Sequence, residues 1–131
     1  MKTSLARTNA ILPYEAAADL TGYVGRFVSL TAGKVSLVSS ATVKPHGVLL
    51  TDGKAGERVT VAVGAGGLAG VIRVKLAAAV TAPGTDLQLT ADGLAQTDAG
   101  TGARVIVAQS LETGAVDELI EAVLFRPVTL T

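Results

Sequence analysis

One strand-and-turn pattern occurs twice along this chain and limits what it can fold into. Residues 25–33 read GRFVSLTAG and residues 84–93 read GTDLQLTADG, so the opening glycines stand 59 residues apart (84 − 25) and Asp92 is the one insertion. In each copy, apolar residues occupy alternate positions between a leading glycine and a Gly-containing turn, which is typical of a strand entering a hairpin. We therefore expect an all-β fold in which two similar β units form one small β-barrel, β-tulip-like module or sandwich.

Further apolar runs with a two-residue period predict the remaining strands. The run at 118–125 (ELIEAVLF) has the composition of a helix, but it is short and its counterpart at 59–63 alternates like a strand, so we expect a strand there. Strands are also expected at 23–31, 34–38, 45–51, 71–76, 87–89, 94–97 and 105–107, with an edge strand after Pro127. Between them we expect a short helical turn at 15–20, a loop at 64–70, and either a strand or a short helix at 77–82.

The N-terminal segment differs from the rest of the chain. It shows no apolar period, carries Lys2 and Arg7 without an acidic residue, and ends at Pro13, whose ring favours extended backbone before it. We interpret residues 1–13 as an extended basic arm. Residues 14–131 are then a single β-rich domain, which suits a chain of 131 residues.

The composition excludes several kinds of chemistry. The chain has no cysteine and no tryptophan, with two Tyr and two Phe, so disulfides and thiolate metal sites are excluded and the core must be aliphatic. No run approaches the roughly 20 apolar residues of a membrane helix. A net charge of zero without a basic stripe argues against binding of nucleic acid.

Charge is unevenly distributed along the chain. Residues 1–75 hold nine Lys/Arg against four Asp/Glu, and residues 76–131 hold two against seven. This division is either scatter over a solvated surface or the basis of a contact in which the basic part of one molecule meets the acidic part of a neighbour. The same two interpretations apply to the acidic group, which lacks both the aromatic platforms of a glycosidase cleft and a calcium-loop pattern. That group consists of Glu112, Asp117, Glu118 and Glu121.

We expect the chain to have no catalytic, cofactor-binding or metal-binding residues. His46 is the one histidine, it stands between Pro45 and Gly47, and no GxSxG nucleophile motif accompanies it. The loop GAGGLAG at 64–70 loosely fits a dinucleotide fingerprint, but the alternating run VIRVKL follows where that fingerprint requires a helix. We therefore interpret the chain as a β module that is not an enzyme.

Several of the turn motifs resemble those of the small capsid cement, or decoration, proteins of tailed bacteriophages. The similar segments are Gly25–Val35, Gly47–Leu50 with its continuation DGKAGERVTVAV, Ala82–Gly93 and the closing Gly114–Phe125. The resemblance implies a β-barrel-like structural protein that binds the outer surface of the assembled phage head and stabilises it. It implies no catalysis and no cofactor, and it implies a virion location after synthesis in the host cytoplasm.

The resemblance also implies partners. Such proteins bind the major capsid protein, often as homotrimers, and they bind neither nucleic acid nor membrane. Their N-terminal arm commonly reaches onto the shell. In this chain the residues suited to that contact are Lys2, Leu5, Arg7, Ile11 and Leu12.

Two other classes of protein are compatible with the same residues. One is another structural part of the virion, such as a head-fibre base or a tail-tube subunit. The other is a small ligand-binding β-barrel or enzyme, which requires a concave site with converging polar groups. The sequence offers no such set of groups, so the structural class is favoured.

Overall fold

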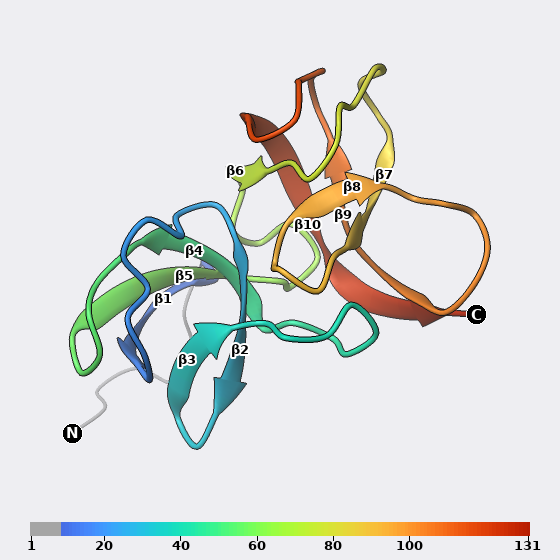
Figure 1. Ribbon diagram of the computed structural model, residues 1–131. Helices are drawn as coiled ribbons and strands as arrows, with labels where there is room; N and C mark the ends of the chain where they lie inside the picture. Colours follow the sequence, from blue (N-terminus) through green and yellow to red (C-terminus); the bar gives the residue numbers. More distant parts are fainter. Residues whose placement is uncertain (1–8) are drawn as a thin grey trace.

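The computed structural model describes residues 9–131, and within them the chain is all-β, as expected (Figure 1). No helix in this part of the chain has the length and apolar character of a membrane span. The strands, in chain order, are β1 (Ile11–Ala16), β2 (Phe27–Thr31), β3 (Lys34–Leu37), β4 (Gly47–Thr51), β5 (Arg58–Val63), β6 (Val71–Lys75), β7 (Asp86–Leu89), β8 (Ala95–Thr97), β9 (Arg104–Ser110) and β10 (Leu119–Leu130).

The strands form two units that follow one another in the sequence and lie side by side (Figure 1). The first unit, β1 to β5, is a closed barrel with strand order β1-β3-β2-β4-β5. The second unit, β6 to β10, is a five-stranded sheet with order β6-β10-β9-β7-β8. Read in the opposite direction around the barrel, the first order becomes β1-β5-β4-β2-β3, so the two units have the same topology.

The correspondence between the units extends to individual residue pairs. In the first unit Leu49 pairs with Val61, and in the second Ser110 pairs with Ala122, each partner being 61 residues further on (110 − 49 and 122 − 61). Other pairs of the two units also match, with the second member 59 to 61 residues further on: Leu12–Val61 with Ile72–Ala122, Val28–Leu37 with Leu87–Thr97, and Val28–Gly47 with Leu87–Ala108. The repeat seen in the sequence is therefore a repeat of the whole unit.

The two units differ in how completely they close. In the first, the parallel pairing of β1 with β3 includes Ala16 and Val35 and completes the barrel. The corresponding residues of the second unit, Leu76 and Ala95, form a single isolated parallel bridge. The second unit thus has the strand order of the barrel, but its first and last strands in that order are joined only by this bridge.

An aliphatic core connects the two units. One cluster of buried side chains lies within the barrel and includes Val28, Val35 and Leu49. A larger cluster contains residues of both units, among them Phe27 of β2 and Ile120 of β10. The apolar interior therefore continues from one unit into the other.

Two glycines allow the backbones of the units to approach each other. The N–H of Phe27 donates to the carbonyl of Gly93 at 2.7 Å, and the N–H of Lys75 donates to the carbonyl of Gly25 at 2.9 Å. A Cβ atom at Gly93 would lie 2.8 Å from the carbonyl oxygen of Phe27, and one at Gly25 would lie 2.3 Å from Leu119 Cδ2. The φ values of +88° at Gly25 and +77° at Gly93 also favour glycine at both positions, and at Gly93 the short contact is to backbone, which cannot move aside as a side chain can.

The predicted arm is wrong at its C-terminal end. Ile11, Leu12 and Pro13 belong to β1 and pair with Ala62, Val61 and Thr60 of β5. Pro13 is tolerated because this part of β1 is hydrogen-bonded along one edge only, as proline in a strand requires. The remaining arm residues, 1–8, lie outside the described part of the chain.

The helical turn expected at 15–20 is also wrong. Glu15 and Ala16 end β1, and Leu20 is buried in the barrel cluster, where its N–H donates to the carbonyl of Gly53 at 2.8 Å. The burial of Leu20 and this non-local hydrogen bond replace the local bonds of a helix.

The ambiguous C-terminal run is a strand, as expected. β10 covers it and continues through Pro127 to Leu130. The pairing of β10 with β9 shifts between Leu124 and Val128, so the proline lies in an irregular stretch that does not need its N–H. The loop expected at 64–70 connects β5 to β6, and the segment at 77–82 contains an isolated bridge at Val80 instead of a helix or a full strand.

Candidate protein interface

The one histidine, His46, contacts the side chain of Tyr14. His46 Nε2 lies 2.7 Å from the hydroxyl of Tyr14, and the two rings meet edge to face with centroids 5.1 Å apart. Burial lowers the pKa of His46 and raises the pKa of Tyr14. The pair joins β1 to the segment before β4, and both β1 and β4 are neighbours of β5 in the barrel. Within residues 9–131, no cluster of His, Cys, Asp and Glu is arranged to hold a metal ion.

The glycine-rich loop is a strand-to-strand connection that packs on β10. It leads into β6 and not into a helix, so the helix N-terminus that binds pyrophosphate in dinucleotide folds is missing here. A Cβ atom at Gly64 would lie 3.1 Å from the carbonyl oxygen of Phe125, and one at Gly67 would lie 3.5 Å from Val123 Cγ1. The connection therefore covers the middle of β10.

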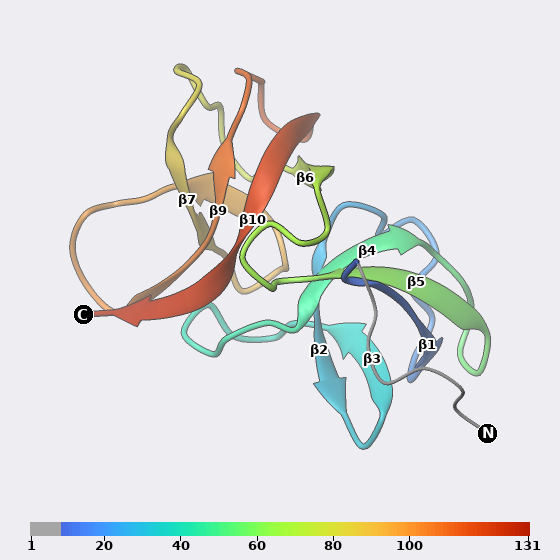
Figure 2. The same ribbon diagram turned by 180° about the vertical axis from the view of Figure 1, so that it is seen from behind.

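An apolar, nearly uncharged surface surrounds this connection. Ile11 is 38% exposed, Leu68 63% and Val71 56%. Three chain segments meet there: residues 9–14, 59–72 and 122–131, in which Arg126 is the one charged side chain. Figure 2 shows the connection between the units, beside β10 and the start of β1. We call this surface the junction face.

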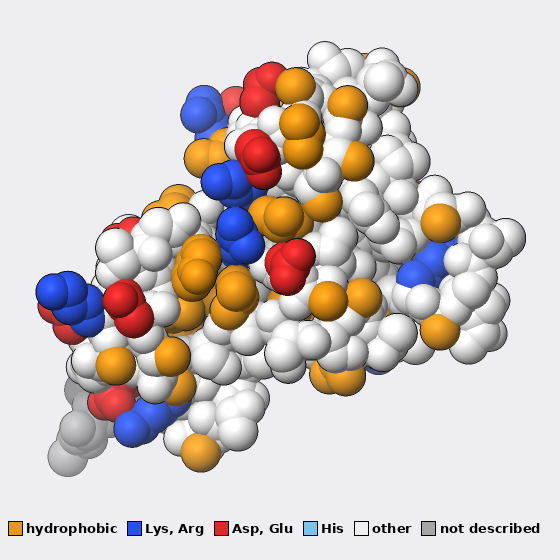
Figure 3. All heavy atoms as spheres, viewed as in Figure 1, with side chains coloured by type: hydrophobic (Ala, Val, Ile, Leu, Met, Phe, Trp, Pro, Cys, Tyr) orange, Lys and Arg blue, Asp and Glu red, His pale blue; other side chains and the backbone are white. Residues whose placement is uncertain are grey.

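The opposite side of the molecule has a different character. Acidic and basic side chains are interspersed there over the region where the units meet (Figure 3). Protein interfaces are depleted in charged residues at their centre and enriched in arginine, whereas scattered charges are typical of solvated surface. The junction face is therefore the better candidate for contact with another protein.

The structure places only some of the predicted contact residues. Ile11 is exposed on the junction face, whereas Leu12 is half buried against the barrel. Lys2, Leu5 and Arg7 lie outside the described residues. The sequence analysis did not identify Leu68 and Val71 as contact residues, although the absence of charged residues at 59–72 could have indicated an apolar surface there.

A groove of about 540 Å³ lies on the first unit, between the β2–β3 hairpin and the segment that leads to β4. Hydroxyl side chains, two exposed apolar residues and one lysine contribute to it. Its lining includes Ser29, Leu30, Thr31, Ser36, Ser39, Val43 and Lys44. This mixture suits binding of a polypeptide and does not bring together an acid, a base and a nucleophile.

The acidic group lies largely at the β9–β10 connection. Glu112 accepts a hydrogen bond from the N–H of Glu121 at 2.9 Å, and Glu118 accepts one from the N–H of Ala115 at 3.1 Å. Asp117 is exposed and has a φ of +66°, which is uncommon for a residue other than glycine. Two of the four carboxylates therefore hold the connection in shape.

Comparison with known proteins identifies the fold. No protein-family model and no curated protein match the chain. Among solved structures, it is similar to the N base of the head fiber protein gp8.5 of bacteriophage phi29, with a TM-score of 0.65 and 18% sequence identity. The match covers 92% of this chain and 97% of that one. The two chains therefore share a fold over nearly their whole length.

Proposed function

We propose that this chain is a structural component of a phage virion and serves as a head-fibre base or a similar module on the outer surface of the head. The main support for this proposal is the structural similarity to a head fiber base, which extends over nearly the whole of both chains. It favours a fibre base over a pure cement protein. The absence of a catalytic motif in the sequence agrees with a structural role and not an enzymatic one.

Attachment to the head is assigned to the junction face. Burial of Ile11, Leu68 and Val71 would remove apolar area from water at about 25 cal/mol per Å². Arg126 is the one charge that such a contact must pair or leave at its rim. The partner is the major capsid protein, which would offer an apolar surface.

The association state proposed for the head-bound protein is a homotrimer. Each copy would bring one junction face to the shell. Linking three weak contacts raises the effective concentration of each, so the assembly holds tightly even where one copy would dissociate.

Variants of the junction face test attachment. Leu68→Asp and Ile11→Asp place a charge on the face, and Val24→Asp is a matched control because Val24 is 37% exposed and lies outside the face. Heads of the phage that encodes the chain, prepared without it, are mixed with each variant and imaged by electron microscopy. We expect occupancy to fall at least tenfold for the first two and to be unchanged for the control.

Two results would contradict parts of the proposal. Full occupancy with Leu68→Asp and Ile11→Asp would place the attachment elsewhere on the molecule. Failure of the unaltered protein to bind any head would remove the virion assignment itself. Heads that become much more resistant to heat when occupied would favour the cement role over the fibre base.

A further inference from the structure

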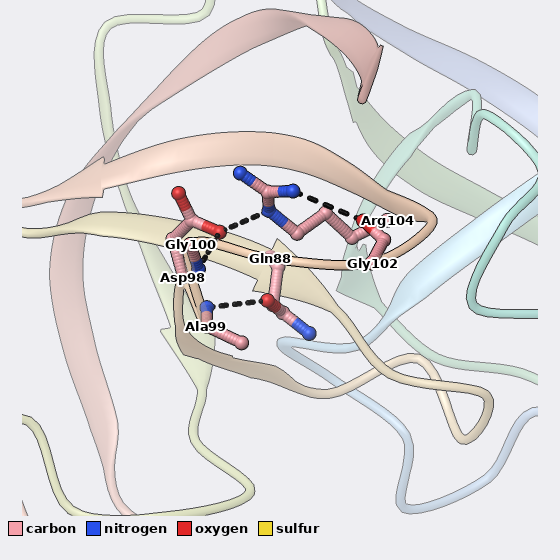
Figure 4. A network of polar contacts seen from close by, with 6 residues as sticks. All are labelled: Gln88, Asp98, Ala99, Gly100, Gly102 and Arg104. Carbon is pink, nitrogen blue, oxygen red and sulfur yellow. Dashed lines mark hydrogen bonds and ion pairs between the residues drawn. The ribbon is translucent and has the colours of Figure 1, made fainter. Parts of the chain in front are cut away.

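In the second unit, side-chain contacts hold the β8–β9 connection against the neighbouring strands, whereas the equivalent region of the first unit is the groove described above. After β8, the N–H of Ala99 donates to Gln88 Oε1 at 2.8 Å. Arg104, which is only 8% exposed, pairs with Asp98 through Nε and donates from Nη1 to the carbonyl of Gly102 at 3.0 Å. Figure 4 shows these contacts drawing the β8–β9 connection against β7 and β9.

The matching residues of the first unit are small. By the register of the strands, Gln88 corresponds to Ser29. Ser39 and Val43 lie in the β3–β4 connection, and counting along the chain from the matched strand residues sets them against Ala99 and Arg104. All three counterparts line the groove of the first unit. Serine and valine cannot reach as far as glutamine and arginine, so the space that the second unit fills from within its own chain is unfilled in the first.

The lining of the groove defines what it can hold. Leu30 is 40% exposed and Val43 60%, so an apolar side chain seated there would cover both. Lys44 is the one formally charged side chain of the lining, apart from the titratable His46. The groove therefore fits an apolar residue that stands next to a carboxylate.

The chain itself carries such a pair. Val116 and Asp117 are adjacent on the exposed β9–β10 connection, where Val116 is 56% exposed. Glu112 and Glu118 hold the connection by bonding backbone N–H groups. Val116 and Asp117 are the two central residues of a turn in which the N–H of Glu118 donates to the carbonyl of Ala115 at 3.2 Å, and Asp117 has a φ of +66°.

We propose that the groove of one copy receives the β9–β10 connection of a second copy. Val116 packs against Leu30 and Val43, and the carboxylate of Asp117 accepts a hydrogen bond from Lys44 Nζ. The contact joins two different surfaces, so it is head-to-tail and closes into a ring if the rotation per copy allows. It deepens the association proposed above and rests on it, and none of Ile11, Leu68 and Val71 of the junction face lines the groove.

A charge exchange tests the contact on the full chain. Lys44→Glu and Asp117→Lys are made singly and together, with Lys54→Glu as control because Lys54 is exposed away from the groove. Sedimentation velocity over a concentration series gives the dissociation constant of the unmodified assembly. We expect each single exchange to weaken association at least tenfold, the double exchange to restore it to within about threefold, and the control to leave it unchanged.

Several outcomes would overturn the inference. An unmodified chain that stays monomeric at millimolar concentration would do so, as would singles that weaken association with no recovery in the double. A Lys44→Glu variant that loses head occupancy while its solution mass is unchanged would mean that the shell protein occupies the groove. Head binding by junction-face variants is measured separately, so failure of the proposed function is distinguishable from failure of this contact.

Discussion

The first and second units share their strand register but differ in what they place at equivalent positions. The Tyr14–His46 pair of the first unit corresponds to Val74 and Val107 of the second, both of which are buried. A polar pair and an aliphatic pair thus fill the same location in one topology. The comparison shows that the strand pairing sets the fold, and that side chains at a given position remain free to vary in chemistry.

The contact between the units is not repeated at the far side of the second unit. The Asp92–Gly93 turn packs on Phe27 and against the side chain of Leu37. The counterparts of these two residues are Asp86 and Thr97, which are exposed and polar. A third unit packed in the same way would find exposed polar side chains at these two positions and not an apolar surface.

The largest effect is expected at the contact between the units. Gly93 and Gly33 have φ values of +77° and +78°, but a Cβ atom would meet Phe27 and Leu37 at Gly93 and nothing within 4 Å at Gly33. Both alanine substitutions carry the cost of a positive φ, about 1–2 kcal/mol, and only Gly93→Ala adds overpacking of about 1–3 kcal/mol. Urea unfolding of both variants measures the difference. Equal decreases in the free energy of unfolding for the two variants would show that tight packing between the units at Gly93 contributes little to stability.

The ion pair between buried Arg104 and half-buried Asp98 in the second unit is expected to have the next largest effect. Asp98→Ala leaves Arg104, with a side chain only 10% exposed, without its carboxylate, and we expect a loss of about 2–3 kcal/mol. Asp92→Ala, on an exposed turn, is the control. Stability is followed by thermal unfolding, and similar losses for both variants would contradict the role of the pair.

The same pair predicts a response to acid. The hydrogen bond from Arg104 lowers the pKa of Asp98 below its unfolded value of about 3.9. The stabilisation is therefore complete above that value and is lost as pH falls through the lower pKa of the folded state. Between about pH 5 and pH 2, Asp98→Ala should show a shallower loss of stability than the unmodified chain, measured by urea midpoints.

The smallest effect is expected at the polar pair of the first unit. Tyr14→Phe removes the hydroxyl that meets His46 Nε2 and should destabilise the fold by about 1 kcal/mol, whereas Tyr23→Phe serves as the control.

The same pair predicts a pH dependence, because burial lowers the pKa of His46 in the folded chain. Below about pH 6.5 the unfolded chain therefore binds more protons than the folded chain, and the free energy of unfolding decreases as the pH is lowered. His46→Gln should flatten that slope, and an unchanged slope would exclude His46 as its cause.

Much of the fold could be predicted from the residues. The alternation of apolar and polar positions and the repeat of the Gly25 and Gly84 segments identified most strands and the two-unit plan. The repeat also favoured strand over helix at 118–125, where composition alone pointed the other way. These features are local or repeated, so they can be read without knowing which strands meet.

Other features depended on contacts between distant parts of the chain. The inclusion of Ile11 to Pro13 in β1, the burial of Leu20, and the near burial of Arg104 against Asp98 each require a partner that sequence spacing does not reveal. The junction face and the groove likewise arise where separate segments converge. Local backbone preference and apolar period determined the strands, whereas the exposed surfaces were decided by tertiary packing, because exposure depends on which neighbours cover each side chain.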